Sequence, residues 1–184
     1  MKLFTSIGCL AVLVAVLLWP AASAWTDIEH RPIFSFTGDG VIGMHDVQTN
    51  NIFNVIYRDT NGHYDEQALA TIDHVFRCHG DQKTFPISVR LVELLDFIQD
   101  HFKAVELKII SGYRSPDYND DLRRRSRRVS RESLHMEGLA ADVVIPGVSA
   151  AELARYAKSL DAGGVGFYGN RAFVHIDVGP VRHW

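Results

Sequence analysis

The stretch "SLHMEGLAADVVIPG" (residues 133–147) joins a polar turn to a short apolar run. The apolar run contains a single carboxylate, Asp142, and the histidine His135 stands shortly before it. A charged carboxylate among apolar side chains is costly to bury unless another group compensates its charge. The sequence therefore predicts that a partner from elsewhere in the chain reaches Asp142.

A candidate partner lies in "AFVHIDV" (172–178), another apolar stretch that reads as a strand. It contains His175, and the two-residue period of a strand places Asp177 on the same sheet face as this histidine. The two imidazoles of His135 and His175 and the carboxylate of Asp142 make a three-ligand set suited to catalytic zinc, with a fourth position for water. The alternative is that Asp142 caps a turn and both histidines are ordinary, because H-x₆-D is a loose spacing.

The remaining patterns predict one α+β domain, in which a mainly antiparallel sheet carries this site and amphipathic helices pack against it. Strands are expected at residues 40–58 (two strands around a turn at 48–51), 104–111, 138–146, 163–168 and 172–178. Helices are expected at residues 65–80, 87–102, 115–125 and 149–160. Gly80 is the expected end of the first helix, with Cys78 as a small apolar residue on it, and Ser115 and Pro116 the expected start of the third.

Residues 1–24 have the pattern of a cleaved secretory signal: a charged start, a short apolar run and a small-x-small site at Ala22–Ala24. The alternative is a retained anchor, although the run is short for a membrane span. We expect a monomeric mature domain at residues 25–184, exported across the inner membrane to the periplasm. The chain carries a formal net charge of −3, which argues against nucleic acid as its partner.

Three stretches, "SGYRSPDYN" (111–119), "SLHMEGLAADVVIPG" and "GGVGFYGNRAFVHIDVGPVRHW" (163–184), together resemble the zinc peptidases grouped as lysostaphin, D-alanyl-D-alanine metallopeptidase and Hedgehog-like domains. The murein endopeptidase K type is the most similar, over about residues 33–184. The resemblance implies zinc bound by His135, Asp142 and His175, and hydrolysis of peptide cross-links between the stem peptides of bacterial peptidoglycan. A D-alanyl-D-alanine carboxypeptidase and a non-catalytic wall-binding or signalling domain are the alternatives.

The resemblance leaves the general base open. Many relatives place an acid three residues before the last zinc histidine, and this chain has Ala172 there. Asp177 is the first expectation, because it shares a sheet face with His175; alternatively, it accepts a hydrogen bond that orients this histidine. His183, near the end of the quoted stretch, is the second candidate for the base.

Two arginine features remain. Arg114 resembles the arginine with which relatives hold a substrate carbonyl or carboxylate, and a guanidinium also suits a developing oxyanion. Alternatively, it is a structural arginine that pairs with Asp117 or Asp120. The stretch "LRRRSRRVSR" (122–131) contains six arginines and is either a solvated face or a strip that binds anions such as stem-peptide carboxylates.

Overall fold

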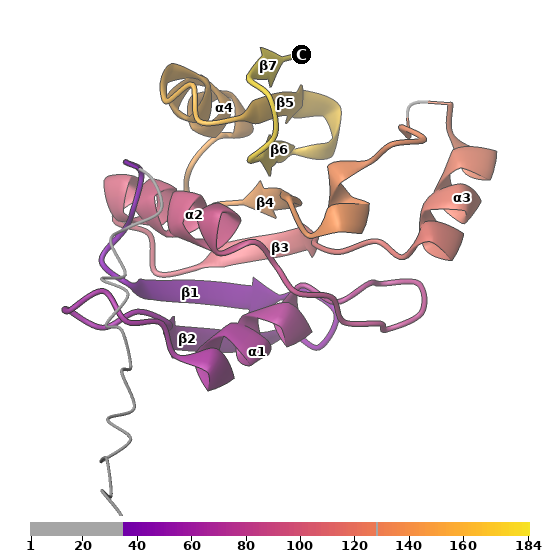
Figure 1. Cartoon of the computed structure of the whole chain (residues 1–184). Coiled ribbons are helices and arrows are strands. Elements are labelled where there is room, and N and C mark those ends of the chain that lie inside the picture. Colours follow the sequence, from indigo (N-terminus) through magenta and orange to yellow (C-terminus); the bar gives the residue numbers. More distant parts are fainter. Residues whose placement is uncertain (1–34, 128) are drawn as a thin grey trace, which may run out of the picture.

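The computed structural model describes residues 35–127 and 129–184, so the predicted signal at residues 1–24 lies outside the described residues. The described residues form one seven-stranded sheet with the strand order β2-β1-β3-β4-β6-β5-β7 (Figure 1). The strands are β1 (Val41–Asp46), β2 (Asn51–Ile56), β3 (Leu107–Ser111), β4 (Ala140–Val144), β5 (Gly164–Tyr168), β6 (Phe173–Asp177) and β7 (Arg182–His183). Only the pairs β1–β3 and β5–β7 are parallel, which confirms the predicted α+β fold with a mainly antiparallel sheet.

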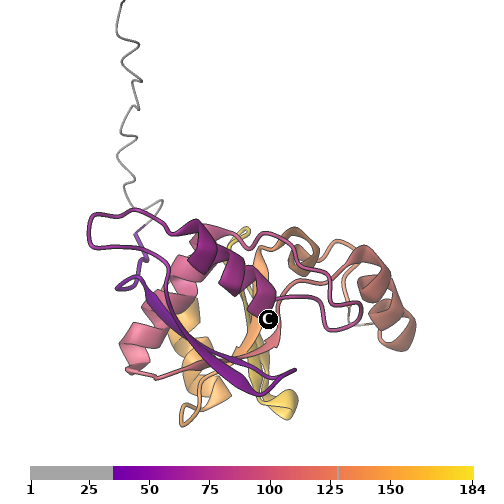
Figure 2. The ribbon, with the colours of Figure 1, turned by 90° about the horizontal axis from the view of Figure 1, so that it is seen from below.

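Three of the four helices in the described residues pack against one face of this sheet, and their apolar residues share one core with it (Figures 1 and 2). The helices are α1 (Glu66–Val75), α2 (Val89–Phe102), α3 (Pro116–Arg125) and α4 (Ala150–Ser159), and the short 3₁₀ turns are η1 (Leu134–Glu137) and η2 (Gly169–Arg171). The rings of His101 on α2 and Tyr156 on α4 stack with centroids 3.5 Å apart, so these two helices touch. The helix α3 stands away from this layer. Within the described ranges, no helix combines the length and apolar character that a bilayer crossing requires.

Side-chain caps confirm three of the four predicted helix starts, whereas Ser88 before α2 makes no such cap. The side chain of Asp65 accepts hydrogen bonds from two backbone N–H groups in the first turn of α1. The side chains of Ser115 and Ser149 accept similar bonds at the starts of α3 and α4, and Pro116 occupies the first turn of α3. Such a cap contributes about 1 kcal/mol to helix stability, so these polar residues fix where each helix begins.

The predicted end of the first helix at Gly80 is wrong, because α1 ends at Val75. The side chain of Phe76 is fully buried, and its carbonyl oxygen accepts a hydrogen bond of 2.7 Å from the backbone N–H of Tyr113. Two residues later the buried sulfur of Cys78 accepts a hydrogen bond from the backbone N–H of Ser115. The chain therefore leaves the helix in order to pack these residues under the loop that follows β3, and Cys78 is not helical.

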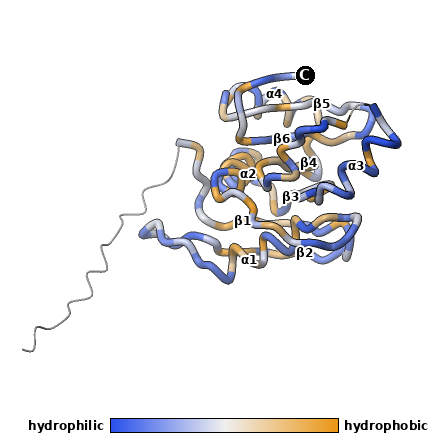
Figure 3. The backbone as a smooth tube through the Cα atoms, turned by 45° about the vertical axis from the view of Figure 1, so that its right-hand side comes forward, coloured by the Kyte–Doolittle hydropathy of each residue, from blue (hydrophilic) through white to orange (hydrophobic). Residues whose placement is uncertain are grey.

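The two faces of β4 and β6 carry different kinds of side chain. Ala141 lies opposite Ile176 in the sheet, and these apolar side chains belong to the core beneath the helices. Asp142 lies opposite His175, and the alternation of a strand turns this pair to the other face. Figure 3 shows the hydrophobic segments gathered in α2 and the central strands, whereas α3 at the edge of the molecule is mostly hydrophilic. The sheet thus separates the apolar core from the polar pair.

Asp96, in the middle of α2, is a fully buried carboxylate that no sequence pattern indicated. Its Oδ2 accepts hydrogen bonds from the hydroxyl of Tyr57 at 2.7 Å and from the backbone N–H of Gly40 at 2.9 Å. Its Oδ1 has no hydrogen-bond partner among the described residues. Burial raises the pKa of Asp96 from 3.8 to about 7, so the folded protein favours the neutral acid.

Asp96→Asn is expected to reduce the pH dependence of stability between about pH 4 and pH 7. The raised pKa means that the folded state binds this proton more tightly than the unfolded chain does, so the contribution to stability is present below the unfolded pKa and is lost as the pH rises through the folded pKa. The effect in the parent is at most about 4 kcal/mol, for a shift of ~3 units. Urea unfolding at about pH 4.5 and about pH 8 measures it. An equal change in stability for parent and variant would contradict this prediction.

Candidate metal centre

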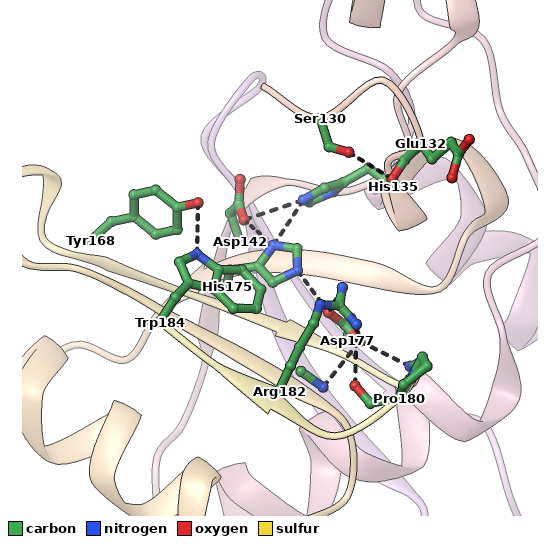
Figure 4. A network of polar contacts seen from close by, with 12 residues as sticks. Ser130, Glu132, His135, Asp142, Tyr168, His175, Asp177, Pro180, Arg182 and Trp184 are labelled. Carbon is green, nitrogen blue, oxygen red and sulfur yellow. Dashed lines mark hydrogen bonds and ion pairs between the residues drawn. The ribbon is translucent and has the colours of Figure 1, made fainter. Parts of the chain in front are cut away.

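The three ligand-type side chains predicted from the sequence converge on the sheet face opposite the helices (Figure 4). Asp142 and His175 are cross-strand partners on β4 and β6, and His135 comes from η1, just before β4. His135 Nε2 lies 3.1 Å from His175 Nδ1, and Asp142 Oδ1 lies 2.9 Å from His175 Nδ1 and 3.3 Å from His135 Nε2. All three side chains are buried, so their polar atoms face one another rather than bulk water.

The opposite nitrogen of each imidazole faces an acceptor. His135 Nδ1 lies 2.7 Å from the carbonyl oxygen of Gly112, and His175 Nε2 lies 3.1 Å from Oδ2 of Asp177. In a neutral imidazole the nitrogen that faces an acceptor carries the proton, so the other nitrogen has a free lone pair. With the protons on the nitrogens that face Gly112 and Asp177, the lone pairs of His135 Nε2 and His175 Nδ1 point at each other and at the carboxylate of Asp142. Three electron-rich atoms this close repel one another unless a cation lies between them.

The separations between these atoms fit a metal ion. A tetrahedral zinc ion with bonds of about 2.0–2.1 Å holds its ligand atoms about 3.3–3.4 Å apart. The three separations of 2.9 Å, 3.1 Å and 3.3 Å are close to that spacing. Two imidazole nitrogens and one carboxylate oxygen are also a common protein ligand set for a catalytic metal. The residues present therefore fit a divalent cation with a coordination position left for another ligand.

The electrostatics favour an ionised carboxylate at the centre. Burial alone would raise the pKa of Asp142, but His135, His175 and Arg114 hold it well below its usual range. Burial lowers the pKa of His135 and thus favours its neutral form. Burial also acts against the protonation of His175, but the neighbouring carboxylates of Asp142 and Asp177 outweigh it and raise the pKa of this histidine. The ionised carboxylate of Asp142 thus places a negative charge where it would stabilise a bound cation.

Arg114 supports Asp142 from the other side. Its Nη2 donates a hydrogen bond of 2.6 Å to Oδ2 of Asp142, and its Nε donates one of 3.0 Å to the hydroxyl of Ser111. A bulge in β3 brings Ser111 opposite Asp142 in the sheet, and such bulges commonly re-aim side chains near functional sites. Arg114 makes no ion pair with Asp117 or Asp120, the partners of the structural alternative, in the described part of the chain.

Asp177 is fully buried and surrounded by hydrogen-bond donors. Its carboxylate accepts from the backbone N–H groups of Gly164 and Gly179 at 3.0 Å and 2.9 Å, and from Nη2 of Arg182 at 2.8 Å. It reaches only the Nε2 side of His175, so the imidazole ring separates it from the three converging ligand atoms (Figure 4). Such a contact is typical of an acceptor that orients a histidine.

The other two positions considered for a base lie apart from these contacts. The ring of His183 lies beside Asp161, with 3.9 Å between His183 Nε2 and Asp161 Oδ1. Ala172 is exposed in the turn between β5 and β6 and has a φ of 57°. In the described residues, neither makes a hydrogen bond or ion pair with the ligand set. The structure thus gathers His135, Asp142, His175 and Arg114 around one point, with Asp177 behind His175.

Sequence reasoning missed Trp184, which borders the centre. Its ring lies 5.3 Å from that of His175 between centroids, and its Nε1 donates a hydrogen bond of 3.1 Å to the hydroxyl of Tyr168. A Cβ at Gly166 would lie 2.5 Å from the indole, so only glycine at this position leaves room for the ring. Gly166 in "GGVGFY" could have indicated this contact, because a glycine inside a strand often marks the close approach of another group.

Comparisons with known proteins show one consistent relationship. The family model described as "Peptidoglycan L,D-endopeptidase MepK" matches residues 38–184. Proteins named peptidoglycan L,D-endopeptidase MepK from Escherichia coli (strain K12) and Shigella flexneri are each 33% identical to the chain over 180 residues, which is 97% of this chain and 93% of the relative. A probable MepK from Haemophilus influenzae is 36% identical over 118 residues, 63% of each chain. No solved structure matches the chain significantly.

Proposed function

The chain belongs to the family described as peptidoglycan L,D-endopeptidase MepK, and on this premise we propose that it is a zinc-dependent endopeptidase that hydrolyses peptide cross-links in bacterial peptidoglycan. The observation that carries the metal-dependent part is the convergence of two imidazole nitrogens and one carboxylate oxygen. We further propose that residues 1–24 are a cleaved signal and that the mature protein acts in the periplasm. The names of the relatives support a peptidoglycan substrate.

In this proposal His135, Asp142 and His175 hold the zinc ion through Nε2, Oδ1 and Nδ1. Zinc, when bound, lowers the pKa of a water ligand and polarises the scissile carbonyl group. Burial keeps bulk water away from the ligands and so strengthens every charge interaction at the centre. The backbone carbonyl of Gly112 fixes the ring of His135 and its tautomer.

Arg114 and Asp177 have distinct roles in this proposal. Arg114 binds the Oδ2 of Asp142, and its Nη1 has no hydrogen-bond partner in the described part of the chain. These free donors suit a substrate carbonyl or carboxylate. Asp177 accepts the Nε2 proton of His175 and so turns Nδ1 toward the metal. We therefore assign Asp177 to orientation of His175 rather than to proton transfer from water.

Digestion of purified sacculi is expected to convert cross-linked muropeptides into monomers, to stop when a chelator removes the metal, and to resume when zinc is added back. Mass spectrometry of the products also identifies the bond that is cut, and an L,D bond is the one to expect if this chain cuts as the names of its relatives describe. Release of free D-alanine alone would instead indicate a carboxypeptidase. Binding to sacculi without any release would indicate a non-catalytic wall-binding domain.

A further inference from the structure

An arginine-rich segment of the chain begins and ends beside the metal centre. Residues 115–134, here called the arginine arm, comprise α3 and the segment that returns to η1, and they connect Arg114 to His135. The backbone N–H of Arg114 donates a hydrogen bond of 3.1 Å to the carbonyl oxygen of His135, so both ends of the arm are fastened beside the ligand set. Figures 1 and 2 show α3 projecting from the layers of the domain.

Hydrogen bonds give the described part of the arm a defined shape. The buried side chain of Asn119 donates a hydrogen bond of 3.1 Å to the carbonyl oxygen of Ser130, which ties the returning segment to α3. The backbone N–H of Ser126 donates to the carbonyl oxygen of Leu122 at 2.9 Å and closes the end of the helix. The backbone that carries the nearby arginines therefore has a fixed position.

The arm concentrates positive charge in a chain that is acidic overall. Residues 122–131 hold six of the 19 basic residues and no acidic one, although the net charge of the chain is −3. Arg123 and Arg124 pair with aspartates one turn earlier on α3. Arg125, Arg127 and Arg131 are exposed and have no hydrogen bond or ion pair with any described residue. Three unpaired guanidinium groups on one short segment create a local positive potential that attracts anions.

The distance from Arg131 to the metal centre suits an extended peptide. Arg131 is four residues before His135, so their Cα atoms are at most about 14 Å apart. An extended peptide advances about 3.3–3.6 Å per residue, so a strand with its scissile bond at the metal reaches Arg131 within about four residues. Peptidoglycan stem peptides are short peptides that carry free carboxylates. Charge and distance thus point to the same partner.

We propose that Arg125, Arg127 and Arg131 form a binding surface for the carboxylates of peptidoglycan stem peptides beside the metal centre, an assignment that rests on the proposed function. A guanidinium can pair with a carboxylate through two parallel hydrogen bonds. The three side chains are exposed, so their attraction for carboxylates is screened by salt. The arm raises the local concentration of anionic strands next to the metal and takes no part in the chemical step.

The combined variant Arg125→Glu, Arg127→Glu and Arg131→Glu is expected to bind purified sacculi about tenfold more weakly at low salt, with little difference at about 1 M salt, where the screening length is only about 3 Å. The matched control is Lys103→Glu, Arg155→Glu and Lys158→Glu, which changes the net charge equally on α4 and the end of α2, across the sheet from the metal centre. Cosedimentation on ice measures binding, while metal content and circular dichroism verify an intact domain. The corresponding glutamine variant repeats the test without charge reversal.

Sacculi whose carboxylates have been amidated identify the ligand. The parent protein should bind amidated sacculi as weakly as the arm variant binds native ones. Equal binding of native sacculi by the arm variant and the control would overturn the proposal, as would a preference of the parent for anionic phospholipid vesicles over sacculi. Binding is read separately from turnover, so a parent that binds through the arm but releases no peptide would remove the endopeptidase assignment and leave the carboxylate surface in place.

Discussion

His135→Ala, Asp142→Ala and His175→Ala are each expected to lose the bound metal and nearly all turnover on sacculi. Each variant removes one of the three atoms that converge within hydrogen-bonding distance on one face of the sheet. The loss of turnover should exceed the roughly 10–100-fold that removal of an outer partner of a metal ligand costs. The parent is expected to bind one zinc ion per chain.

Elemental analysis of the purified variants, alongside sacculus digestion, tests this expectation. His74→Ala is a suitable control because His74 is an exposed histidine on α1, on the opposite side of the sheet from the centre, and it should retain the metal and turnover. Circular dichroism must show an intact fold, since a collapsed variant would lose metal for an unrelated reason. Full metal content in all three well-folded variants would remove the site assignment.

The candidate ligand set could be predicted from the sequence because its signal is local. Asp142 interrupts an apolar strand, and the alternation of strands fixes which face a side chain occupies, so the cost of burying Asp142 alone already required a partner. The resemblance to known zinc peptidases then favoured the set of His135, Asp142 and His175 over the alternative that both histidines are ordinary. The structure brings these three side chains together as cross-strand and turn neighbours.

Features that depend on contacts distant in sequence were not predictable in this way. The early end of α1 follows from a hydrogen bond between Phe76 and Tyr113, which no local pattern encodes. The bulge that places Ser111 opposite Asp142, and thereby anchors Arg114, depends on the register of two strands. The strand β7 has only two residues and pairs in parallel with β5, so it has no alternation to detect.

The case of Asp177 shows the limit of strand periodicity. Alternation correctly placed it on the same face as His175, and the two side chains are in contact. Periodicity does not reveal which ring nitrogen the carboxylate meets, and that detail separates a general base from an orienting acceptor. The contact is to Nε2, whereas Nδ1 faces Asp142 and His135.

Asp177→Asn is therefore expected to weaken zinc binding by about 10–100-fold, with turnover largely restored when free zinc is raised to saturation. All the groups that contact the carboxylate are donors: two backbone N–H groups, Arg182 and the Nε2 of His175. An amide presents one acceptor and one N–H₂ group, so its N–H₂ must face one of these donors. The hydrogen bonding that orients the ring of His175 is therefore weakened. The variant should also lose about 1–3 kcal/mol of stability, the usual cost of an unsatisfied buried group.

The dependence of turnover on free zinc separates the two roles of Asp177. A general base acts on the water and not on the ligand, so its removal would leave the zinc dissociation constant unchanged and reduce turnover by roughly 10²–10⁴-fold at every zinc concentration. An orienting acceptor acts through His175, so its removal shifts the zinc dependence and spares much of the turnover at saturation. Competition with a chelator of known affinity gives the dissociation constant, and Asp161→Asn, at an exposed aspartate beside His183, is the matched control. A turnover deficit that persists at saturating zinc with unchanged affinity would return Asp177 to the role of base.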